Sequence, residues 1–385
     1  MVISRTVLIL GMGELGGLMA ELLARSQHFQ GRIVGADFNE DLGLRKANSA
    51  RQGAIAWGSD VEVDFASCDM SDVDRCAELI DRVKPDLVFN ATTVSSWWLR
   101  DLLPTEIKTK LHAIGAGSGL WSAGHAAYAY NMMRAVKRAG VSPWVVNSAY
   151  PDAVNPALAR AGLPPTIGIG NGALLVAAFR HLVAVKLGVP PSRIHVYLIA
   201  HHFHAYNTLV HGDTRGLDFY LKILHGDEDV TRQFDRMALV RAVPDAARIP
   251  AAAGATWIVA AQAMQVVLAL LTRNTEVVHA PGPAGMIGGY PVTVTPDVEL
   301  ALPSDIDRRR ATEINEIAQR AEGIDRIEND GTLVLGDVAR ATLKDVFGFE
   351  CNRYPLDDCL ALARELGVRL RELGDRLGIR LKVHA

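Results

Sequence analysis

Short apolar runs alternate with amphipathic segments along the first 150 residues. The run over residues 6–10 (TVLIL) is wholly apolar, as in a parallel strand buried on both faces, and residues 32–36 and 86–89 form similar runs. After the first run, Leu15 and Leu18 begin a stripe of apolar side chains at helical spacing. Strand and helix therefore alternate, which predicts an α/β fold with a doubly wound parallel sheet.

The pattern changes near Asn147. From residue 155 onward the helical segments become longer and richer in alanine, and from residue 304 a charged amphipathic helix begins a third region. A turn signal, NDGT, and two further helices close the chain. We therefore expect a first domain over residues 1–150, an α+β domain over residues 151–305 and a helical extension over residues 306–385.

Composition and charge restrict the class of protein. Of the 385 residues, 49% are hydrophobic and 22% are charged, which is typical of a globular chain. A net charge of −3 without dense Lys/Arg runs argues against a nucleic-acid partner. The longest apolar helical segment, residues 258–271, is too short to span a bilayer, and the apolar N-terminal run is too short for a signal peptide. The four cysteines form no CxxC pair, and we interpret them as reduced thiols. We therefore expect a soluble, cytoplasmic protein.

A glycine-rich loop follows the first predicted strand and opens a helix. It reads Gly11-Met12-Gly13-Glu14-Leu15-Gly16, and an acidic residue, Asp37, ends the next strand. This order is the Rossmann dinucleotide-binding pattern, in which Gly11 permits the tight turn, Gly13 lets the pyrophosphate approach and Gly16 allows close helix–strand packing. We expect the six loop residues and Asp37 to bind the cofactor, with the pyrophosphate at the helix N-terminus.

The acidic residue also bears on the choice of cofactor. The Asp37 carboxylate can accept hydrogen bonds from a ribose diol and would repel a 2′-phosphate, so the sequence predicts NAD in preference to NADP. Arg45, in the following helix, leaves NADP open. Asp69, after the third strand, is either an adenine contact or part of a helix N-cap. The strand end nearest the nicotinamide is expected to contribute Asn90, Ala91 and Thr92 to the cofactor site, and Asn147 is expected to contact the cofactor as well.

The second half carries a series of motifs in a definite order. They are VVNS, VNP, GIG, AFRHLVAVKLGV, RIHVYLI and AHHFH, between residues 145 and 204. Together with the glycine loop, this order resembles the lactate/malate dehydrogenase superfamily over residues 6–305. The resemblance implies a Rossmann domain followed by an α+β catalytic domain, and an NAD-linked oxidoreductase.

The resemblance also implies roles for single residues. The family's catalytic histidine falls on His202, and histidine suits the role because its pKa near 6.5 allows both proton gain and proton loss. The asparagine that hydrogen-bonds the substrate oxygen falls on Asn147. The family's threonine at the start of the long helix falls on Thr256.

Two family positions differ in this chain. The arginine that clamps a substrate carboxylate falls on Ala178, and the aspartate that orients the histidine falls on Leu175. A bidentate clamp needs a guanidinium, so a simple 2-hydroxy acid is not implied. His202 would have to take a carboxylate partner from elsewhere, and Asp213 is one candidate.

The superfamily includes NAD-dependent family 4 glycoside hydrolases, whose histidine segment the run AHHFHAYNTLVHGD resembles. Their metal-binding cysteine falls in a turn that reads GIGN here, so a metal-dependent reaction is not implied. A zinc site among His201, His202, His204 and His211 is the alternative, but on a strand His202 and His204 would share one face while His201 would point away. The sequence therefore predicts no metal.

The stretch after Thr92 corresponds to the family's substrate-covering loop. Trp97, with Trp98 beside it, is a candidate to cover an apolar face of the substrate, and core packing is the alternative. Arg100 is a candidate to replace the missing arginine as an anion anchor. His125 is interpreted as a helix-start residue and not as a catalyst.

Taken together, these residues predict an NAD(P)-dependent oxidoreductase that transfers a hydride between nicotinamide and a secondary alcohol or ketone of a small polar substrate. Three alternatives stay open: a redox-assisted lyase or hydrolase acting on a sugar-like substrate, a non-catalytic NAD-binding protein, and an imine-reducing amino-acid dehydrogenase. The expected catalytic residues are His202, Asn147 and Thr256, and the expected substrate contacts are Trp97, Arg100, His202 and Thr256. Family members pair through long helices, so we expect a homo-oligomer.

Overall fold

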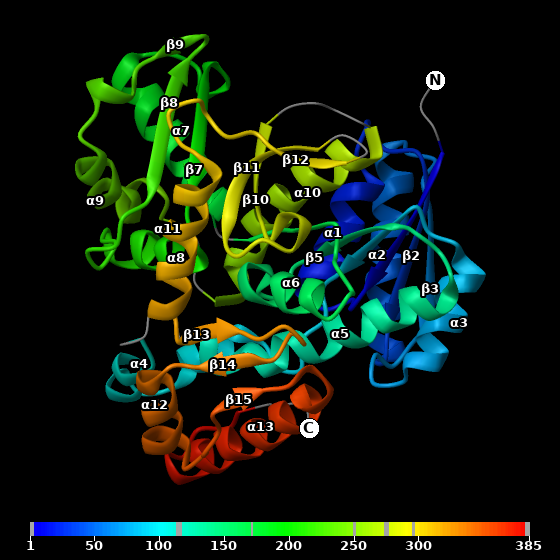
Figure 1. Cartoon of the computed structure of the whole chain (residues 1–385). Coiled ribbons are helices and arrows are strands. Elements are labelled where there is room, and N and C mark those ends of the chain that lie inside the picture. Colours follow the sequence, from blue (N-terminus) through cyan, green and yellow to red (C-terminus); the bar gives the residue numbers. More distant parts are fainter. Residues whose placement is uncertain are drawn as a thin grey trace.

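The structure is a computed structural model that describes residues 4–112, 118–170, 172–248, 252–272, 277–294 and 297–381. Its N-terminal part is built on a six-stranded parallel sheet with the order β3-β2-β1-β4-β5-β6 (Figure 1). The strands are β1 (Arg5–Leu10), β2 (Gly31–Asp37), β3 (Glu62–Ser67), β4 (Leu87–Asn90), β5 (Trp144–Asn147) and β6 (Ile167–Gly168). The predicted doubly wound sheet is therefore confirmed.

Helices cover both faces of this sheet. They are α1 (Glu14–Ala24), α2 (Glu40–Trp57), α3 (Val73–Val83), α5 (Ser122–Ala139) and α6 (Pro151–Arg160). Successive residues of β1 point to opposite faces of the sheet. Leu8 packs in the same core as α3 and α5, whereas Val7 and Ile9 pack in the core of α1 and α2. The wholly apolar strand runs in the sequence follow from burial on both sides.

Between β4 and α5 the chain makes an excursion at the carboxyl edge of the sheet. It contains two short 3₁₀ helices, η1 (Trp97–Leu102) and η2 (Ser118–Trp121), and the helix α4 (Thr105–His112). The substrate-covering loop that the resemblance implies falls on this excursion, and its role stays a prediction.

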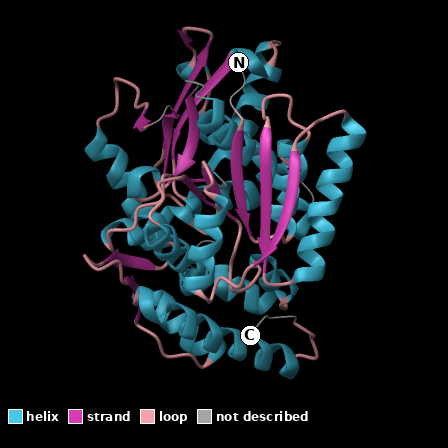
Figure 2. Cartoon of the chain, turned by 90° about the vertical axis from the view of Figure 1, so that its right-hand side faces the viewer, coloured by secondary structure: helices cyan, strands magenta, loops and turns pink. Residues whose placement is uncertain are grey.

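In its described residues, the second part of the chain contains two small antiparallel sheets and four α-helices. Figure 2 shows the chain coloured by helix and strand. One sheet contains β7 (Ile194–Ile199), β8 (Tyr220–His225) and β9 (Glu228–Asp229), and the other contains β10 (Val277–Pro281), β11 (Gly289–Val294) and β12 (Val298–Leu300). The helices are α7 (Gly172–Leu187), α8 (His202–His211), α9 (Arg236–Ala246) and α10 (Thr256–Thr272). A bridge between Ala200 and Gly289 connects the two sheets just before α8 begins.

The C-terminal part was expected to be helical, and that expectation is incomplete. Besides α11 (Arg308–Ala321), α12 (Asp337–Phe347) and α13 (Cys359–Arg376), it contains a sheet of β13 (Ile324–Ile327), β14 (Leu333–Leu335) and β15 (Arg353–Tyr354). The NDGT turn joins β13 to β14 as an antiparallel hairpin, as its sequence predicts. The third strand was missed because β15 has two residues and lacks an apolar alternation.

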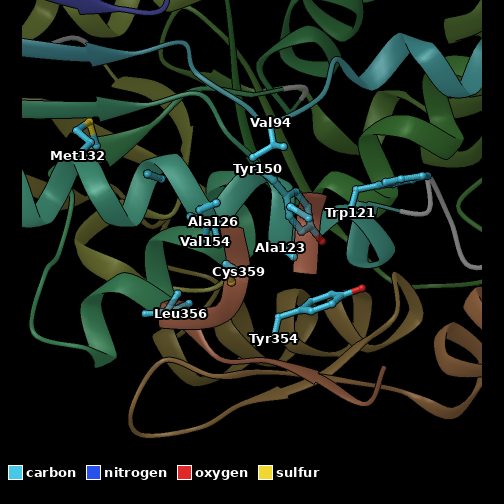
Figure 3. Close-up of a cluster of buried hydrophobic side chains, with 14 of the residues drawn as sticks. Val94, Trp121, Ala123, Ala126, Met132, Tyr150, Val154, Tyr354, Leu356 and Cys359 are labelled. Carbon is cyan, nitrogen blue, oxygen red and sulfur yellow. The ribbon is translucent and has the colours of Figure 1, made fainter. Parts of the chain in front are cut away.

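This C-terminal part packs against the Rossmann helices and shares their core (Figure 3). The hydroxyl of Tyr354, which is fully buried, donates a hydrogen bond to the carbonyl oxygen of Leu120 at 2.9 Å. The rings of Trp121 and Phe347 meet edge to face, with centroids 5.5 Å apart. Within the described residues, no helix combines the length and apolarity that crossing a membrane requires.

The shared core predicts that a cavity in α12 will destabilise the whole chain. Leu343 is fully buried, so Leu343→Ala should lower the free energy of unfolding by about 2–5 kcal/mol, measured by urea denaturation. Val338 lies on the exposed face of the same helix, and Val338→Ala should change the free energy of unfolding by about 0.5 kcal/mol or less. Equal effects of the two substitutions would contradict this packing.

Candidate active site

The glycine loop has the geometry that its three glycines predict. Gly11 has a φ of +87°, and a Cβ there would lie 2.9 Å from the carbonyl oxygen of Ala91. A Cβ on Gly16 would lie 1.8 Å from the carbonyl oxygen of Gly11, so the loop and α1 approach too closely for any side chain. A Cβ on Gly13 would meet nothing within 4 Å, and Gly13 precedes α1 without a side-chain cap. The loop therefore leaves open space beside the uncapped amide groups of α1.

Asp37 is tied to this loop. Its Oδ2 accepts a hydrogen bond from the backbone N–H of Met12 at 2.7 Å, and its Oδ1 accepts one from Asn39 at 2.9 Å. Met12 is fully buried, and its backbone N–H is engaged by Asp37. Glu14 is exposed at the first position of α1, and the side chain of Leu15 packs against the core.

Asp69 forms a local turn after β3. Its carboxylate accepts a hydrogen bond from the backbone N–H of Ser71 at 2.8 Å and is exposed. The N-cap of α3 is a different residue, Asp72, which accepts from Asp74 and Arg75. The helix N-cap expected in the segment CDMSD is therefore present, but Asp72 and not Asp69 supplies it, and the adenine contact of Asp69 stays a prediction.

Three asparagines link the carboxyl ends of the central strands. The amide of Asn90 donates to Asn147 Oδ1 at 2.9 Å, and the amide of Asn147 donates to Asn155 Oδ1 at 2.8 Å. Asn90 also accepts hydrogen bonds from the backbone and hydroxyl of Thr92, beside Ala91. Asn147 is fully buried, and its side-chain amide is hydrogen-bonded to both Asn90 and Asn155. Its predicted hydrogen bond to a substrate oxygen would therefore have to replace one of these hydrogen bonds.

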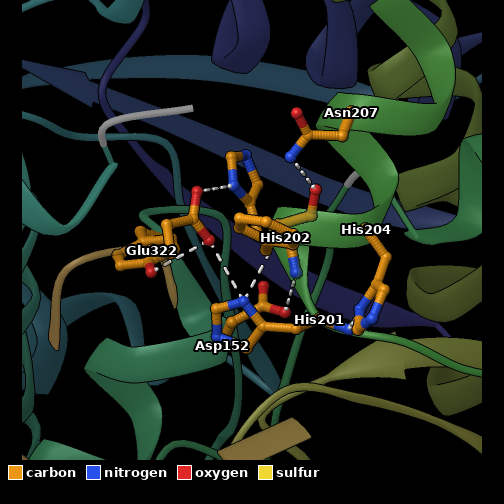
Figure 4. A network of polar contacts seen from close by, with 8 residues as sticks. Asp152, His201, His202, His204, Asn207 and Glu322 are labelled. Atoms are coloured by element: carbon orange, nitrogen blue, oxygen red, sulfur yellow. Dashed lines mark hydrogen bonds and ion pairs between the residues drawn. The ribbon is translucent and has the colours of Figure 1, made fainter. Parts of the chain in front are cut away.

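The histidine segment begins a helix, so the strand geometry used in the argument about a zinc site does not apply. His201 is the N-cap of α8, and His202 is its first residue. Both imidazoles converge on one carboxylate (Figure 4): His202 Nδ1 lies 2.6 Å from Glu322 Oε1, and His201 Nδ1 lies 3.1 Å from Glu322 Oε2. The partner of His202 is thus Glu322, which directly follows α11. Asp213 instead is exposed and accepts from the backbone of Arg215.

Two residues that follow β5 complete the surroundings of this carboxylate. Tyr150 donates its hydroxyl to Glu322 Oε2 at 3.3 Å, and its ring centroid lies 5.5 Å from that of His202. The Tyr150 backbone has a φ of +46°, a left-handed conformation that a non-glycine residue rarely adopts outside constrained sites. Asp152 Oδ1 accepts the backbone N–H of His202 at 2.9 Å and so fixes the start of α8.

Burial and charge set the protonation states of the pair. Burial alone would raise the pKa of Glu322, but the charges and hydrogen bonds of His202 and His201 outweigh it and hold that pKa well below its usual value. Burial lowers the pKa of His202, yet the Glu322 carboxylate outweighs burial and raises it. The site therefore holds a carboxylate beside a histidine that is more readily protonated than a free imidazole.

Of the other predicted substrate contacts, only Arg100 has a described relation to this pair. Arg100 and His125 line a cleft beside Tyr150, and burial, with the nearby charges of Arg100 and His202, lowers the pKa of His125 to about 3. Thr256 is buried at the first position of α10. Trp97 is the first residue of η1. Leu175 and Ala178, which replace the family's charged pair, are buried in the apolar core around α7.

Sequence reasoning missed Glu322 and Tyr150. Glu322 follows a charged amphipathic helix, where a glutamate usually faces solvent, and Tyr150 belongs to no motif. No local pattern marks either residue. Among the side chains that the structure describes, no group of three or more His, Cys, Asp or Glu residues could hold a metal ion.

Comparisons with known proteins agree with the fold. Residues 7–139 match the family model described as the saccharopine dehydrogenase NADP binding domain. No curated protein matches the chain. Among solved structures, the minor L-lactate dehydrogenase of Enterococcus mundtii is similar, with a TM-score of 0.56 and 18% identity, covering 82% of this chain and 95% of that one.

Two structures from Cryptosporidium parvum are similar as well. Its lactate dehydrogenase gives a TM-score of 0.53 at 18% identity, covering 84% of this chain and 97% of that one. Its malate dehydrogenase gives a TM-score of 0.51 at 16% identity, covering 83% of this chain and 98% of that one. The predicted fold, a Rossmann domain followed by a lactate/malate dehydrogenase-like domain, is confirmed. The matches give no support to the resemblance to glycoside hydrolases.

The ion pair predicts how the titration of His202 will respond to loss of its partner. In Glu322→Gln, burial remains while the carboxylate charge is lost, so the pKa of His202 should fall below its wild-type value. Histidine NMR titration, with the signal assigned by His202→Asn, measures this shift. Glu313→Gln, on the exposed face of α11, serves as the control and should leave the titration unchanged. An unchanged pKa in Glu322→Gln would exclude the pairing.

Proposed function

We propose that the chain is a nicotinamide-dependent oxidoreductase that transfers a hydride between the cofactor and a secondary alcohol or ketone of a small polar substrate. The observation that carries this proposal is the His202–Glu322 pair near the carboxyl edge of a sheet that also bears the glycine loop. In open α/β sheets, ligands bind at this edge. An acid–base group beside the expected nicotinamide position is what reduction of a carbonyl requires.

The residues present fit a dinucleotide. The open space at Gly13 admits a pyrophosphate, and the uncapped amide groups of α1 can donate hydrogen bonds to it. Asp37, held by the loop backbone, would accept the hydroxyls of the adenosine ribose. Arg45 forms an exposed ion pair with Asp41 at 2.9 Å. We therefore favour NAD over NADP, although the matched family model is described as NADP-binding.

In the proposed reduction, His202 is the proton donor. The bound nicotinamide supplies or accepts the hydride. Because Glu322 holds Nδ1 of His202, the other ring nitrogen, Nε2, is the one that would give its proton to the substrate oxygen. Glu322 orients the ring and stabilises its protonated form, which is the task of the aspartate that Leu175 replaces. Arg100 would hold an anionic part of the substrate.

The cofactor site predicts a specific effect of the acidic side chain. Asp37→Ala should weaken NADH binding about 10- to 100-fold, because charge-assisted hydrogen bonds are lost. Titration of the full chain by NADH fluorescence measures this change. The control is Asp60→Ala, since Asp60 is exposed at the opposite end of the sheet, and it should bind NADH like the wild type. Equal binding by Asp37→Ala would remove the basis for the cofactor assignment.

The proton donor predicts a second effect. His202→Asn should lower kcat/KM for ketone reduction about 10²- to 10⁴-fold with NADH affinity unchanged. Wild-type kcat/KM should be high at low pH and fall as pH rises through the raised pKa of His202, because the proton to be donated is then absent. The reverse oxidation should have the opposite pH dependence. Steady-state rates followed by NADH absorbance provide both measurements.

Other outcomes would identify the alternatives. Substrate conversion without net change in NADH would favour a redox-assisted lyase or hydrolase. NADH binding without turnover of any alcohol or ketone, unaffected by His202→Asn, would favour a non-catalytic cofactor-binding protein.

A further inference from the structure

Tyr150 lies among three imidazole rings. Its ring centroid lies 5.5 Å from that of His202, 6.0 Å from that of His125 and 6.2 Å from that of His201. The side chain is buried, and its hydroxyl donates a hydrogen bond to Oε2 of Glu322 at 3.3 Å. The reaction proposed above gives this residue no role.

The two oxygens of Glu322 have different neighbours. Oε1 lies 2.6 Å from Nδ1 of His202, whereas Oε2 faces the Tyr150 hydroxyl and, at 3.1 Å, Nδ1 of His201. A proton on Nδ1 of His202 therefore faces Oε1. Tyr150 contacts the same carboxylate at its other oxygen and has no hydrogen bond of its own to His202 among the contacts described.

The Tyr150 hydroxyl stays protonated at neutral pH. Burial, and after it the charge of Glu322, raises the pKa of Tyr150 well above its usual value. A neutral phenol beside a carboxylate acts as the donor, because an ionised carboxylate has only acceptor atoms. Glu322 thus receives this hydrogen bond throughout the pH range in which a histidine titrates.

A hydrogen bond donated to a carboxylate stabilises its charged form and weakens its attraction for a further proton. Burial lowers the pKa of His202 and the Glu322 carboxylate raises it, and the Tyr150 hydroxyl limits the second effect. The other charged or titratable groups that neighbour the pair are Arg100 of η1, His125 of α5, Asp152 of α6 and His201 at the start of α8.

We propose that Tyr150 is a positioning residue that acts through Glu322: its hydroxyl weakens the attraction of the carboxylate for the proton on His202, so that His202 can release a proton to the substrate. This inference deepens the proposed function and rests on it for the step at His202. The left-handed backbone of Tyr150, with a φ of +46°, is an independent observation in its favour, since strained non-glycine residues cluster at functional sites.

Tyr150→Phe removes the hydroxyl and keeps the ring that packs against the imidazoles. In the full chain, histidine NMR titration should show the pKa of His202 rising above its wild-type value, whereas disruption of the pair, as in Glu322→Gln, should lower it. In the double variant Tyr150→Phe/Glu322→Gln, the pKa should match that of Glu322→Gln alone, because the carboxylate through which the tyrosine acts is gone. Loss of a merely structural contact would not produce this pattern.

The rate of ketone reduction should change with the pKa. A proton that is held more strongly is donated more slowly, so kcat at low pH should fall about three- to tenfold in Tyr150→Phe, the range that one hydrogen bond supplies, with KM within about twofold of wild type. The fall of kcat/KM with rising pH should occur at a higher pH than in the wild type, because His202 keeps its proton longer.

Tyr130→Phe is the matched control. Tyr130 donates the same kind of hydrogen bond to an exposed carboxylate, Oδ1 of Asp357, at 3.0 Å. Its loss should leave the pKa of His202 and the pH profile unchanged. If Tyr150→Phe does not fold, 3-fluorotyrosine at position 150, which has a stronger donor and nearly the same size, should lower the pKa of His202.

Three results would overturn the proposal: an unchanged or lowered pKa of His202 in folded Tyr150→Phe, an equal rise of that pKa when Glu322→Gln is also present, or no response to 3-fluorotyrosine. If the pKa shifts occur as expected but the chain reduces no ketone, the action of Tyr150 on His202 stands and the proposed function fails.

Discussion

The site depends on one buried carboxylate. Glu322 is completely enclosed, and an isolated charge in such a place costs several kcal/mol. It is tolerated because His202, His201 and Tyr150 direct polar groups at its two oxygens. These partners come from the start of α8 and the residue before α6, so the carboxylate fixes three distant parts of the chain relative to one another. The same contacts set the protonation of His202 and support the chemistry that we propose for it.

Features encoded by neighbouring residues could be predicted from the sequence. The glycine loop and Asp37 belong to a motif in which backbone conformation is dictated locally, and the structure shows the positive φ of Gly11 and the contact between Met12 and Asp37. Strands buried on both faces have an apolar composition that identifies them without any tertiary information. The hairpin at NDGT follows from turn chemistry alone.

Features that depend on tertiary contacts could not be predicted. The carboxylate partner of His202 lies 120 residues away in sequence, and nothing near Glu322 indicates that it is buried. The apolar residues at Leu175 and Ala178 suggested that the histidine had lost its partner, whereas the carboxylate comes from another element. The resemblance matches the histidine-rich segment to a catalytic loop, but capping by His201 and the contact of Asp152 with the His202 backbone start a helix there.

Glu322 is synthesised after both histidines, because the chain is made from the N-terminus onward. A chain still attached to the ribosome has its dinucleotide loop and its histidines before the carboxylate and α13 have emerged. During that interval His202 lacks the charge that favours its protonated form. A product that terminates before residue 322 would therefore contain the glycine loop and both histidines but not the carboxylate that raises the pKa of His202.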